Sequence, residues 1–337
     1  MKRIAFIPYT PLGDALLAMA QLDELHRVFA PCEITVFAVP LVAELYGAYR
    51  PCDRIAPLPG GPHGIEALPD DPSGAGSFDA AFLLDYEPIA TELVRRLRPR
   101  AAYGMEEEHR PAAECREVFT RWVSLDRWKT ETLTRRPLVS QQMAEVVRLV
   151  SPGYEGAPPR LSAANYRLER PNGLPDRPFA LLMPGTSADW KKWPIGNFLD
   201  LAGALEADGL SVVFAVGPQD ADARASLAAA GRPLLDSLPI PALAGAIAAA
   251  RLVVGNDSGP MQLAACFDTP TLRLFSHSGA DNWFCQNDPR HRLLMPECGI
   301  RRGRSCGSCE RDCIGWITLD AALRECREAL CINRFTQ

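Results

Sequence analysis

A chain of 337 residues is longer than the about 150 residues that one domain usually holds, so we expect two domains. Hydrophobic residues make up 47% and charged residues 23%, which is typical of a folded protein and argues against long disordered stretches. The 36 basic and 41 acidic residues give a net charge of −5, which argues against nucleic acid as the main partner.

The apolar run that follows Lys2 and Arg3 is too short for a secretory signal peptide. The sequence also lacks an uninterrupted apolar run of about 18 residues, the length that a membrane-spanning helix needs. We therefore expect a cytoplasmic protein. In that reducing compartment the eleven cysteines favour metal binding over disulfides.

The first half of the chain alternates short apolar runs with segments of helical periodicity. Strands are predicted at residues 2–7, 34–39 and 78–84, and helices at 14–29, 41–49 and 89–97. Residues 57–77 begin with six prolines and glycines in eight positions, which predicts a long surface loop. The charged segment 105–136, with Trp122 and Trp128, predicts a helical insertion, and a lid over the acceptor is the alternative.

The proline-rich stretch 167–178 predicts a linker, after which the alternation resumes. Strands are predicted at 179–183, 210–216, 252–255 and 271–275, and helices at 197–207, 221–230, 240–250, 261–266 and 318–330. We predict an α/β fold with two doubly wound, Rossmann-like domains facing a cleft where ligands bind. Their predicted bounds are residues 1–165 and 166–317, followed by a C-terminal helix at 318–337.

Three common catalytic fingerprints are missing from the sequence. No Gly-x-Gly-x-x-Gly follows the first strand, and there is no Gly-Lys-Ser/Thr phosphate loop or Gly-x-Ser-x-Gly elbow. A simple dehydrogenase, a P-loop NTPase and a typical serine hydrolase are therefore poor hypotheses.

The loop between the first strand and the first helix carries Gly13 and Asp14. Gly13 would allow a tight turn, and the helix would begin at Asp14, beside the cleft. Asp14 has two interpretations, a helix N-cap or a general base whose carboxylate faces the cleft.

The first loop of the second half combines Gly185, Thr186 and Ser187 with the basic pair Lys191 and Lys192. Hydroxyls, free backbone amides and an ammonium group close together suit a phosphate. The alternative is a solvated loop followed by a helix that Pro194 starts.

The sharpest motif is Gly255-Asn256-Asp257-Ser258-Gly259-Pro260, at the end of a buried strand and the start of a helix. Small residues let a ligand approach the helix N-terminus, which favours anions, and an N-cap role for Asp257 or Ser258 is the alternative. Asp220 and Asp222 could suggest a metal-binding Asp-x-Asp, but we interpret them as capping and charge at a helix start.

Four cysteines form the cluster Cys298-x7-Cys306-x2-Cys309-x3-Cys313. Four thiolates without a nearby histidine suit an all-sulfur zinc or iron site, whose closed tetrahedral shell would be structural. The alternative is a set of reduced thiols on a surface loop.

Taken together, Leu12-Gly13-Asp14, Pro184-Gly185 with Lys191-Lys192-Trp193-Pro194, and Gly255 to Met261 resemble the ADP-heptose lipopolysaccharide heptosyltransferases, glycosyltransferase family 9. The resemblance implies a GT-B fold with an N-terminal acceptor domain and a C-terminal nucleotide-sugar domain. It also implies inverting transfer, with ADP-heptose as the expected donor and no catalytic metal. The acceptor would be a lipopolysaccharide core saccharide or a protein hydroxyl, met at the inner membrane face.

The resemblance assigns roles to individual residues. Asp14 would take the proton of the acceptor hydroxyl, and Lys191 would neutralise the departing diphosphate. Gln262 stands where the family usually has histidine. The predicted nucleotide-sugar site comprises Gly13, Gly185, Thr186, Ser187, Lys192, Asp257, Ser258, Gly259, Pro260 and Gln262.

The cysteine cluster is similar to the iron-binding cysteine finger of the heptosyltransferases that modify autotransporter proteins. Two alternative functions remain beside the heptosyltransferase one. A GT-B enzyme could use a UDP- or GDP-sugar, or the chain could be a catalytically silent protein that binds a nucleotide sugar or serves as a metal scaffold.

Overall fold

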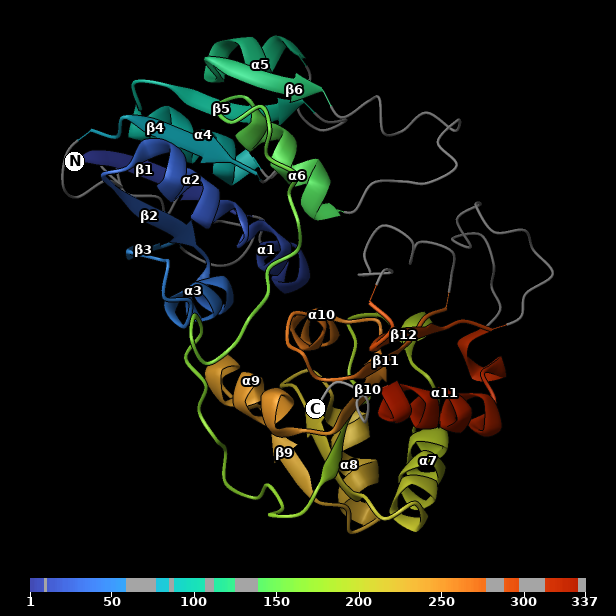
Figure 1. The fold of residues 1–337 in the computed structure, drawn as a ribbon. Helices are drawn as coiled ribbons and strands as arrows, with labels where there is room; N and C mark the ends of the chain where they lie inside the picture. Colours follow the sequence, from blue (N-terminus) through green and yellow to red (C-terminus); the bar gives the residue numbers. More distant parts are fainter. Residues whose placement is uncertain are drawn as a thin grey trace. The chain divides into compact units, whose positions relative to one another are not determined.

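The computed structural model describes residues 1–8, 11–58, 77–84, 88–106, 112–124, 139–276, 288–296 and 313–332. The chain forms two units, each built on its own parallel sheet with helices on both faces (Figure 1). Unit 1 comprises Met1–Arg160 and Asn165–Arg167, and unit 2 comprises Leu161–Ala164 and Leu168–Gln337. This is the α/β class that the alternating pattern predicts.

The sheet of unit 1 has the order β3-β2-β1-β4-β5-β6, with all neighbouring pairs parallel. The central strand β1 is apolar and buried from Ile4 to Ile7, as expected for a strand covered on both faces. The strands are β1 (Lys2–Ile7), β2 (Cys32–Ala38), β3 (Arg54–Pro57), β4 (Ala80–Leu83), β5 (Ala102–Glu106) and β6 (Arg121–Ser124).

Helices α4 and α5 contribute to the apolar core on one face of this sheet. Helices α1 and α2 both contact α6, α1 also contacts α3, and α2, α3 and α6 contact strands of the sheet. The helices are α1 (Leu12–Ala18), α2 (Gln21–Phe29), α3 (Pro40–Gly47), α4 (Pro88–Leu97), α5 (Ala112–Val118) and α6 (Val139–Arg148).

The single helix predicted at 14–29 is wrong, because the chain forms α1 and α2 with a break at Met19 and Ala20. The buried hydroxyl of Tyr46 donates a hydrogen bond of 2.8 Å to the carbonyl of Ala15, the acceptor that a continuous helix would offer to Met19. The amide of Met19 instead bonds to the carbonyl of Leu16, which ends α1.

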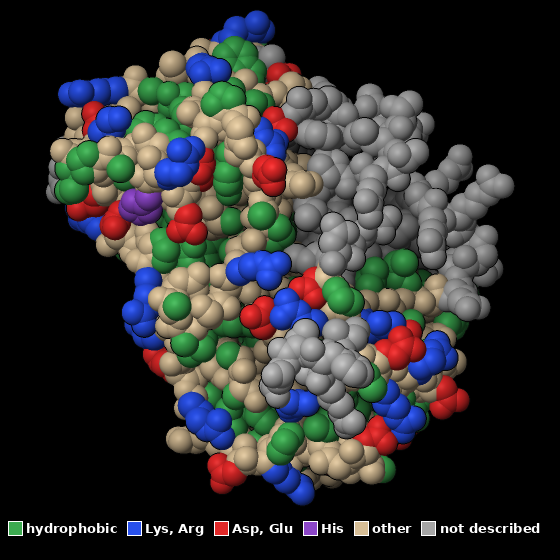
Figure 2. All heavy atoms as spheres, in the orientation of Figure 1, with side chains coloured by type: hydrophobic (Ala, Val, Ile, Leu, Met, Phe, Trp, Pro, Cys, Tyr) green, Lys and Arg blue, Asp and Glu red, His purple; other side chains and the backbone are tan. Residues whose placement is uncertain are grey.

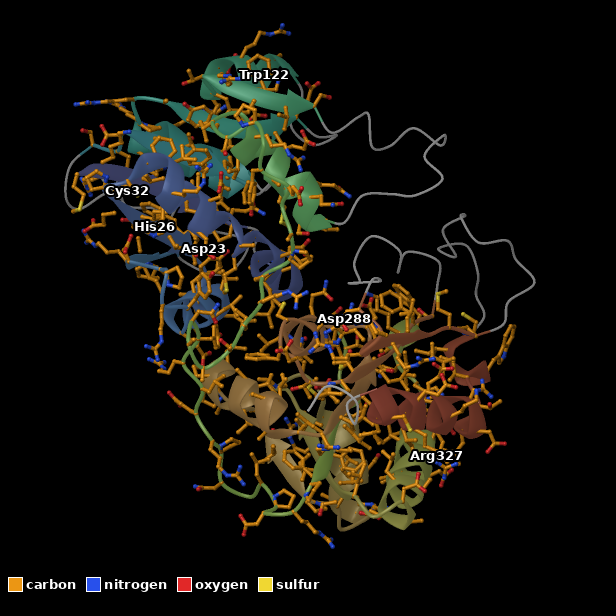
Figure 3. All side chains as sticks on the ribbon, viewed as in Figure 1. Asp23, His26, Cys32, Trp122, Asp288 and Arg327 are labelled. Carbon is orange, nitrogen blue, oxygen red and sulfur yellow. The ribbon has the colours of Figure 1, made fainter. Side chains whose placement is uncertain are left out.

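The helical insertion predicted at 105–136 is also wrong for the residues described there. This region contributes the end of β5, helix α5 and strand β6. Trp122 lies on β6 and packs, half-buried, against the core of unit 1 (Figure 3). Gly104 on β5 leaves room for the ring of Phe119, since a Cβ there would lie 2.2 Å from it. Trp128 lies outside the described residues.

The sheet of unit 2 has the order β12-β11-β10-β7-β8-β9 and is parallel throughout. Its strands are β7 (Phe179–Met183), β8 (Ser211–Val216), β9 (Leu234–Asp236), β10 (Leu252–Asn256), β11 (Thr271–Leu274) and β12 (His291–Leu294). Its helices are α7 (Ile195–Ala207), α8 (Ala221–Ala229), α9 (Ile240–Ala249), α10 (Gly259–Ala265) and α11 (Leu319–Ile332), with short 3₁₀ helices η2 (Asp189–Lys191) and η5 (Cys313–Trp316).

The main apolar core of unit 2 lies between its sheet and helices α7, α8 and α11. The last helix is part of this core, because Ala322, Cys326 and Ala329 of α11 are fully buried against it. Helix α10 packs instead against α9, β10 and β11. The site described below lies beside α10.

Among the helices that the structure describes, none is long and apolar enough to cross a membrane. On the face shown in Figure 2, basic and acidic side chains alternate over the described surface without a large area of one sign.

His291, at the start of β12, is a buried titratable group of unit 2. Its Nδ1 shares a hydrogen bond of 3.0 Å with the hydroxyl of Thr271. Burial lowers the pKa of His291 to about 4, although nearby Asp288 opposes this shift (Figure 3).

We expect His291 to make unit 2 less stable as the pH falls from about 6.5 to about 4, because the unfolded chain binds a proton there that the fold excludes. Between pH 7.5 and pH 5 the loss should be about 2 kcal/mol, measured by urea unfolding. His291→Asn should remove this part of the pH dependence. An unchanged pH dependence in the variant would contradict the assignment.

Candidate functional site

Two loops of unit 2 meet where β7 and β10 end. These strands are parallel neighbours with Met183 opposite Gly255, so the segments that follow them leave the sheet side by side. In open α/β sheets, this carboxyl edge is where ligands bind. The first loop runs over residues 184–194, and the second segment is the turn 256–258 before α10.

An ion pair joins the two segments. The Nζ of Lys191, in η2, lies 2.7 Å from Oδ2 of Asp257, and their side chains are 22% and 17% exposed. The hydroxyl of Thr186 donates to the backbone carbonyl of Asp257 at 2.7 Å. The structure thus brings Thr186, Lys191 and Asp257 of the predicted site together.

Asn256 fixes both ends of the same loop. Its fully buried amide donates to the carbonyl of Pro184 at 2.7 Å and accepts a hydrogen bond from the amide of Trp193 at 3.1 Å. The indole of buried Trp193 donates to the carbonyl of Ile317 at 2.9 Å. Sequence analysis assigned Asn256 no role, although its place between a buried strand and Asp257 was the available signal.

Close backbone packing explains two of the glycines. A Cβ at Gly255 would lie 2.6 Å from the carbonyl oxygen of Met183, so only glycine lets β10 end against β7. A Cβ at Gly185 would lie 2.1 Å from Oδ2 of Asp220. The carboxylate of Asp220 therefore lies directly against the predicted phosphate loop.

Asp220 was expected to cap α8, and it occupies the N-cap position. Its side chain does not bond to a helix amide, however. The carboxylate instead accepts a hydrogen bond of 2.8 Å from the amide of Gly217, in the turn that follows β8. The capping expectation is therefore wrong for the side chain.

Ser258 holds the N-cap position of α10, with Gly259 and Pro260 in the first turn. Its side chain makes no capping bond, and its buried Oγ has no hydrogen-bond partner among the described residues. The N-cap alternative therefore accounts for the position of Ser258 and not for its hydroxyl. Asp257 lies outside the helix, and its carboxylate binds Lys191.

The two neighbouring lysines have different partners. Lys192 pairs with Asp189 at 2.7 Å, and this hydrogen bond raises the pKa of Lys192. Because Asp189 is almost fully exposed, that pair lies in solvent, in contrast to the half-buried Lys191–Asp257 pair. The side chain of Ser187 is exposed.

Arg273 is a site residue that sequence analysis missed. It lies on β11 directly opposite Gly255, and its side chain is 1% exposed. Its guanidinium donates to Oε1 of Gln262 on α10 and lies 3.9 Å from Oδ1 of Asp257. The signal was an arginine in the middle of an apolar strand, a position that requires a charged or polar partner nearby.

Asp14 belongs to unit 1, where it lies half-buried in the first turn of α1 together with Gly13. Pro11 holds the N-cap position. The N-cap interpretation of Asp14 is therefore wrong, and the tight turn expected at Gly13 is part of the helix.

Three of the four clustered cysteines, Cys298, Cys306 and Cys309, lie outside the described residues. Cys313 is buried in η5, and its thiol donates to the carbonyl of Ser276 at 2.8 Å. Within the described ranges, no group of three or more histidine, cysteine or acidic side chains could hold a metal ion.

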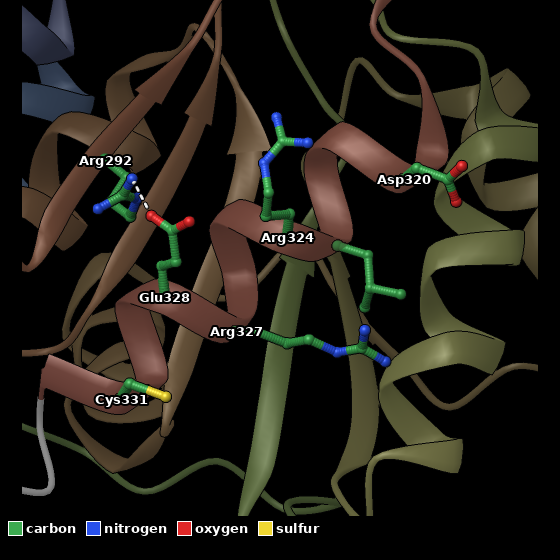
Figure 4. Close-up of a pocket in the computed structure, with 7 residues that line it drawn as sticks. Arg292, Asp320, Arg324, Arg327, Glu328 and Cys331 are labelled. Carbon is green, nitrogen blue, oxygen red and sulfur yellow. Dashed lines mark hydrogen bonds and ion pairs between the residues drawn. The ribbon is translucent and has the colours of Figure 1, made fainter.

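A concave region, about 620 Å³ in volume, lies along α11 (Figure 4). Its arginines are engaged in ion pairs: Arg292 with Glu325 and Glu328, and Arg327 with Asp208. These pairs attach α11 to β12 and to the end of α7, so this region is part of the packing of α11.

Comparisons with known proteins agree with this architecture. The model of glycosyltransferase family 9 (heptosyltransferase) matches residues 74–294. Lipopolysaccharide heptosyltransferase 3 of Escherichia coli is 24% identical over 292 residues, which is 80% of this chain and 82% of that protein.

Two solved structures share the fold at low sequence identity. The family 9 glycosyl transferase from Veillonella parvula DSM 2008 has a TM-score of 0.81 and 17% identity, and the alignment covers 98% of both chains. The E. coli heptosyltransferase WaaC with ADP has a TM-score of 0.68 and 18% identity over 98% of this chain and 99% of that chain. Two parallel six-stranded sheets with flanking helices are the GT-B architecture of these enzymes.

The matched residues include strands β4, β5 and β6 of unit 1 and all six strands of the unit 2 sheet, with β7, β10 and the loops that follow them. This chain belongs to glycosyltransferase family 9, the heptosyltransferase family, and is a glycosyltransferase.

Proposed function

We propose that this glycosyltransferase transfers heptose from ADP-heptose to a hydroxyl of a lipopolysaccharide core saccharide or of a protein. The observation that carries the proposal is the Lys191–Asp257 pair at the carboxyl edge of unit 2, in a family 9 protein. ADP in the related WaaC supports an adenine nucleotide. An acceptor on a lipopolysaccharide precursor would bring the enzyme to the inner membrane face.

Unit 2 binds the donor in this proposal. The ammonium of Lys191 neutralises charge that builds on the diphosphate as its bond to the sugar breaks. The hydroxyl of Ser258 has no hydrogen-bond partner among the described residues and suits a hydrogen bond to a ribose or phosphate oxygen. The hydroxyl of Thr186 donates its one hydrogen bond to the carbonyl of Asp257, so its oxygen can accept a hydrogen bond from a ribose hydroxyl. Gly185 and Gly255 let the two segments pack closely against Asp220 and Met183, which fixes the shape of this edge. Lys192, Ser187, Gly259, Pro260 and Gln262 complete the proposed donor site.

Unit 1 binds the acceptor, with Asp14 as the general base beside Gly13. As the acceptor oxygen attacks the anomeric carbon, its proton passes to the carboxylate of Asp14. The bond between that carbon and the diphosphate breaks, and ADP leaves with the electron pair. The configuration at the anomeric carbon is inverted. No metal takes part in this step.

A structural metal at Cys298, Cys306, Cys309 and Cys313 is a second part of the proposal. The thiol of Cys313 is buried and contacts the backbone of Ser276. Four thiolates together form a complete tetrahedral ligand set for zinc or iron. The metal would hold the two chain segments that meet at Ser276 and Cys313. It would supply folding stability and no catalytic step.

Donor binding is tested by calorimetry with ADP, UDP, GDP and NAD. We expect ADP to bind selectively, Asp257→Ala to abolish this binding and Lys191→Ala to weaken it about tenfold to a hundredfold through the lost charge on the diphosphate. Lys2→Ala, a lysine of unit 1, is the matched control and should bind normally.

Binding of UDP or GDP instead would retain a glycosyltransferase and discard the ADP-sugar. Binding of no nucleotide would favour the silent scaffold.

The general base is tested with Asp14→Asn. Turnover should fall by a factor of about 10² to 10⁴, while the Kd for ADP should change less than twofold, since the amide cannot accept the proton. Asp23→Asn, on the next helix of unit 1, should keep its turnover (Figure 3). Equal activity of Asp14→Asn and the wild type would rule out this role.

The metal is tested by elemental analysis of protein purified without oxygen. We expect about one zinc or iron per chain, lost in the Cys306→Ser/Cys309→Ser double variant because the ligand set is broken. Cys331→Ser changes an exposed cysteine on α11 and should leave the metal content unchanged. Protein without metal would show that these are unliganded thiols.

A further inference from the structure

The burial of Arg273 is the feature of unit 2 that the proposed function leaves unexplained. The flanking residues Leu272 and Leu274 point into the main apolar core, whereas Arg273 points to the opposite face of β11, toward Gln262 on α10. A buried guanidinium loses its hydration and is tolerated only where protein groups replace water. The side chain therefore needs a defined set of partners.

Those partners belong to the donor site. Arg273 donates to the amide oxygen of Gln262, which is 4% exposed, and lies 3.9 Å from Oδ1 of Asp257. Its guanidinium carbon also lies 5.7 Å from the ring centre of Phe275. Arg273 thus connects β11, α10 and the turn after β10.

The two oxygens of Asp257 face different cations. Oδ2 binds Lys191 at 2.7 Å, and Oδ1 faces Arg273. Lys191 is partly exposed on a short 3₁₀ turn within a loop, whereas Arg273 is enclosed in a strand. Lys191 is therefore the cation that can turn toward a ligand, and Arg273 is the cation that remains beside Asp257.

The charges of these three side chains sum to +1. A diphosphate carries at least two negative charges. If the ammonium of Lys191 moved from Asp257 to the diphosphate, the half-buried carboxylate of Asp257 would lose its close cation. Arg273 prevents this because it remains beside that carboxylate. The arrangement therefore suits a ligand with a diphosphate group and gives no advantage to an uncharged nucleoside.

We propose that Arg273 is a positioning residue of the donor site, which holds Asp257 and Gln262 while Lys191 turns from Asp257 to the diphosphate. This inference rests on the proposed function, because it assumes that the carboxyl edge of unit 2 binds a nucleoside diphosphate. It assigns to β11 a part in donor recognition without direct contact with the donor.

The test compares ADP and adenosine binding by calorimetry in wild type, Arg273→Gln, Arg273→Lys and Asp257→Asn. Arg273→Gln should weaken ADP binding at least tenfold and change adenosine binding less than twofold, because Lys191 is then the remaining close cation of Asp257. Arg273→Lys keeps the charge and should stay within about threefold of the wild type. A residue that only stabilised the fold would affect both ligands equally.

The double variant Arg273→Gln/Asp257→Asn tests the coupling. If both residues act through one interaction, the double variant should bind ADP no more weakly than the single variant with the lower ADP affinity. Additive losses would overturn the proposal. Arg292→Gln is the matched control, since Arg292 lies on the neighbouring strand β12 and pairs with Glu325 and Glu328 of α11. Its ADP affinity should be unchanged.

If the Arg273→Gln variant does not fold, Gln262→Met is the substitute variant for the same comparison of ADP and adenosine binding. It removes the amide that Arg273 holds, keeps the charge pair, and should weaken ADP binding about threefold to fivefold with adenosine unaffected. If the wild type binds ADP and both Arg273→Gln and Gln262→Met bind it equally well, the role of Arg273 alone is disproved. Wild-type protein that binds neither ADP, UDP nor GDP disproves the proposed function, and the role of Arg273 falls with it.

Discussion

The site in unit 2 depends on the hydrogen bonds and ion pairs of two residues, Asn256 at the end of β10 and Asp257 directly after it. Asn256 binds the backbone at both ends of the loop after β7, and Asp257 binds the lysine in its middle. Strand β10 lies between β7 and β11, so a turn at its end reaches side chains from both neighbours. The loop that carries Lys191 is therefore held by contacts that converge on two adjacent residues, Asn256 and Asp257.

The same turn also balances charge at the carboxyl edge of the sheet. Burial of Arg273 is costly by itself, and the hydrogen bond to Gln262 and the nearby charge of Asp257 offset part of that cost. With Lys191 on the other carboxylate oxygen, positive charge exceeds negative charge among these three side chains. The chemistry that we propose for this glycosyltransferase uses such an excess, because its leaving group is a diphosphate.

Much of the fold could be predicted from the sequence, since central strands such as β7 and β10 are continuous apolar runs that end in glycine, proline or polar residues. Edge strands β3, β6, β9 and β12 were missed because three or four residues show no period. At the break between α1 and α2, the carbonyl of Ala15 accepts a hydrogen bond from Tyr46, 31 residues distant, and no local sequence pattern predicts that contact. The loops of the candidate site could be predicted because polar residues follow buried strands. Arg273 could not, because its role depends on the register that places it beside Gly255 and near Asp257.

We expect the ammonium of Lys191 to exchange Asp257 for a phosphate oxygen when the donor binds. The most direct measurement is a crystal structure of the complex with ADP. We expect the Nζ of Lys191 within hydrogen-bond distance of a phosphate oxygen, with Asp257 still facing Arg273. A diphosphate bound at this edge while Lys191 stays on Asp257, or bound elsewhere in the protein, would contradict the account.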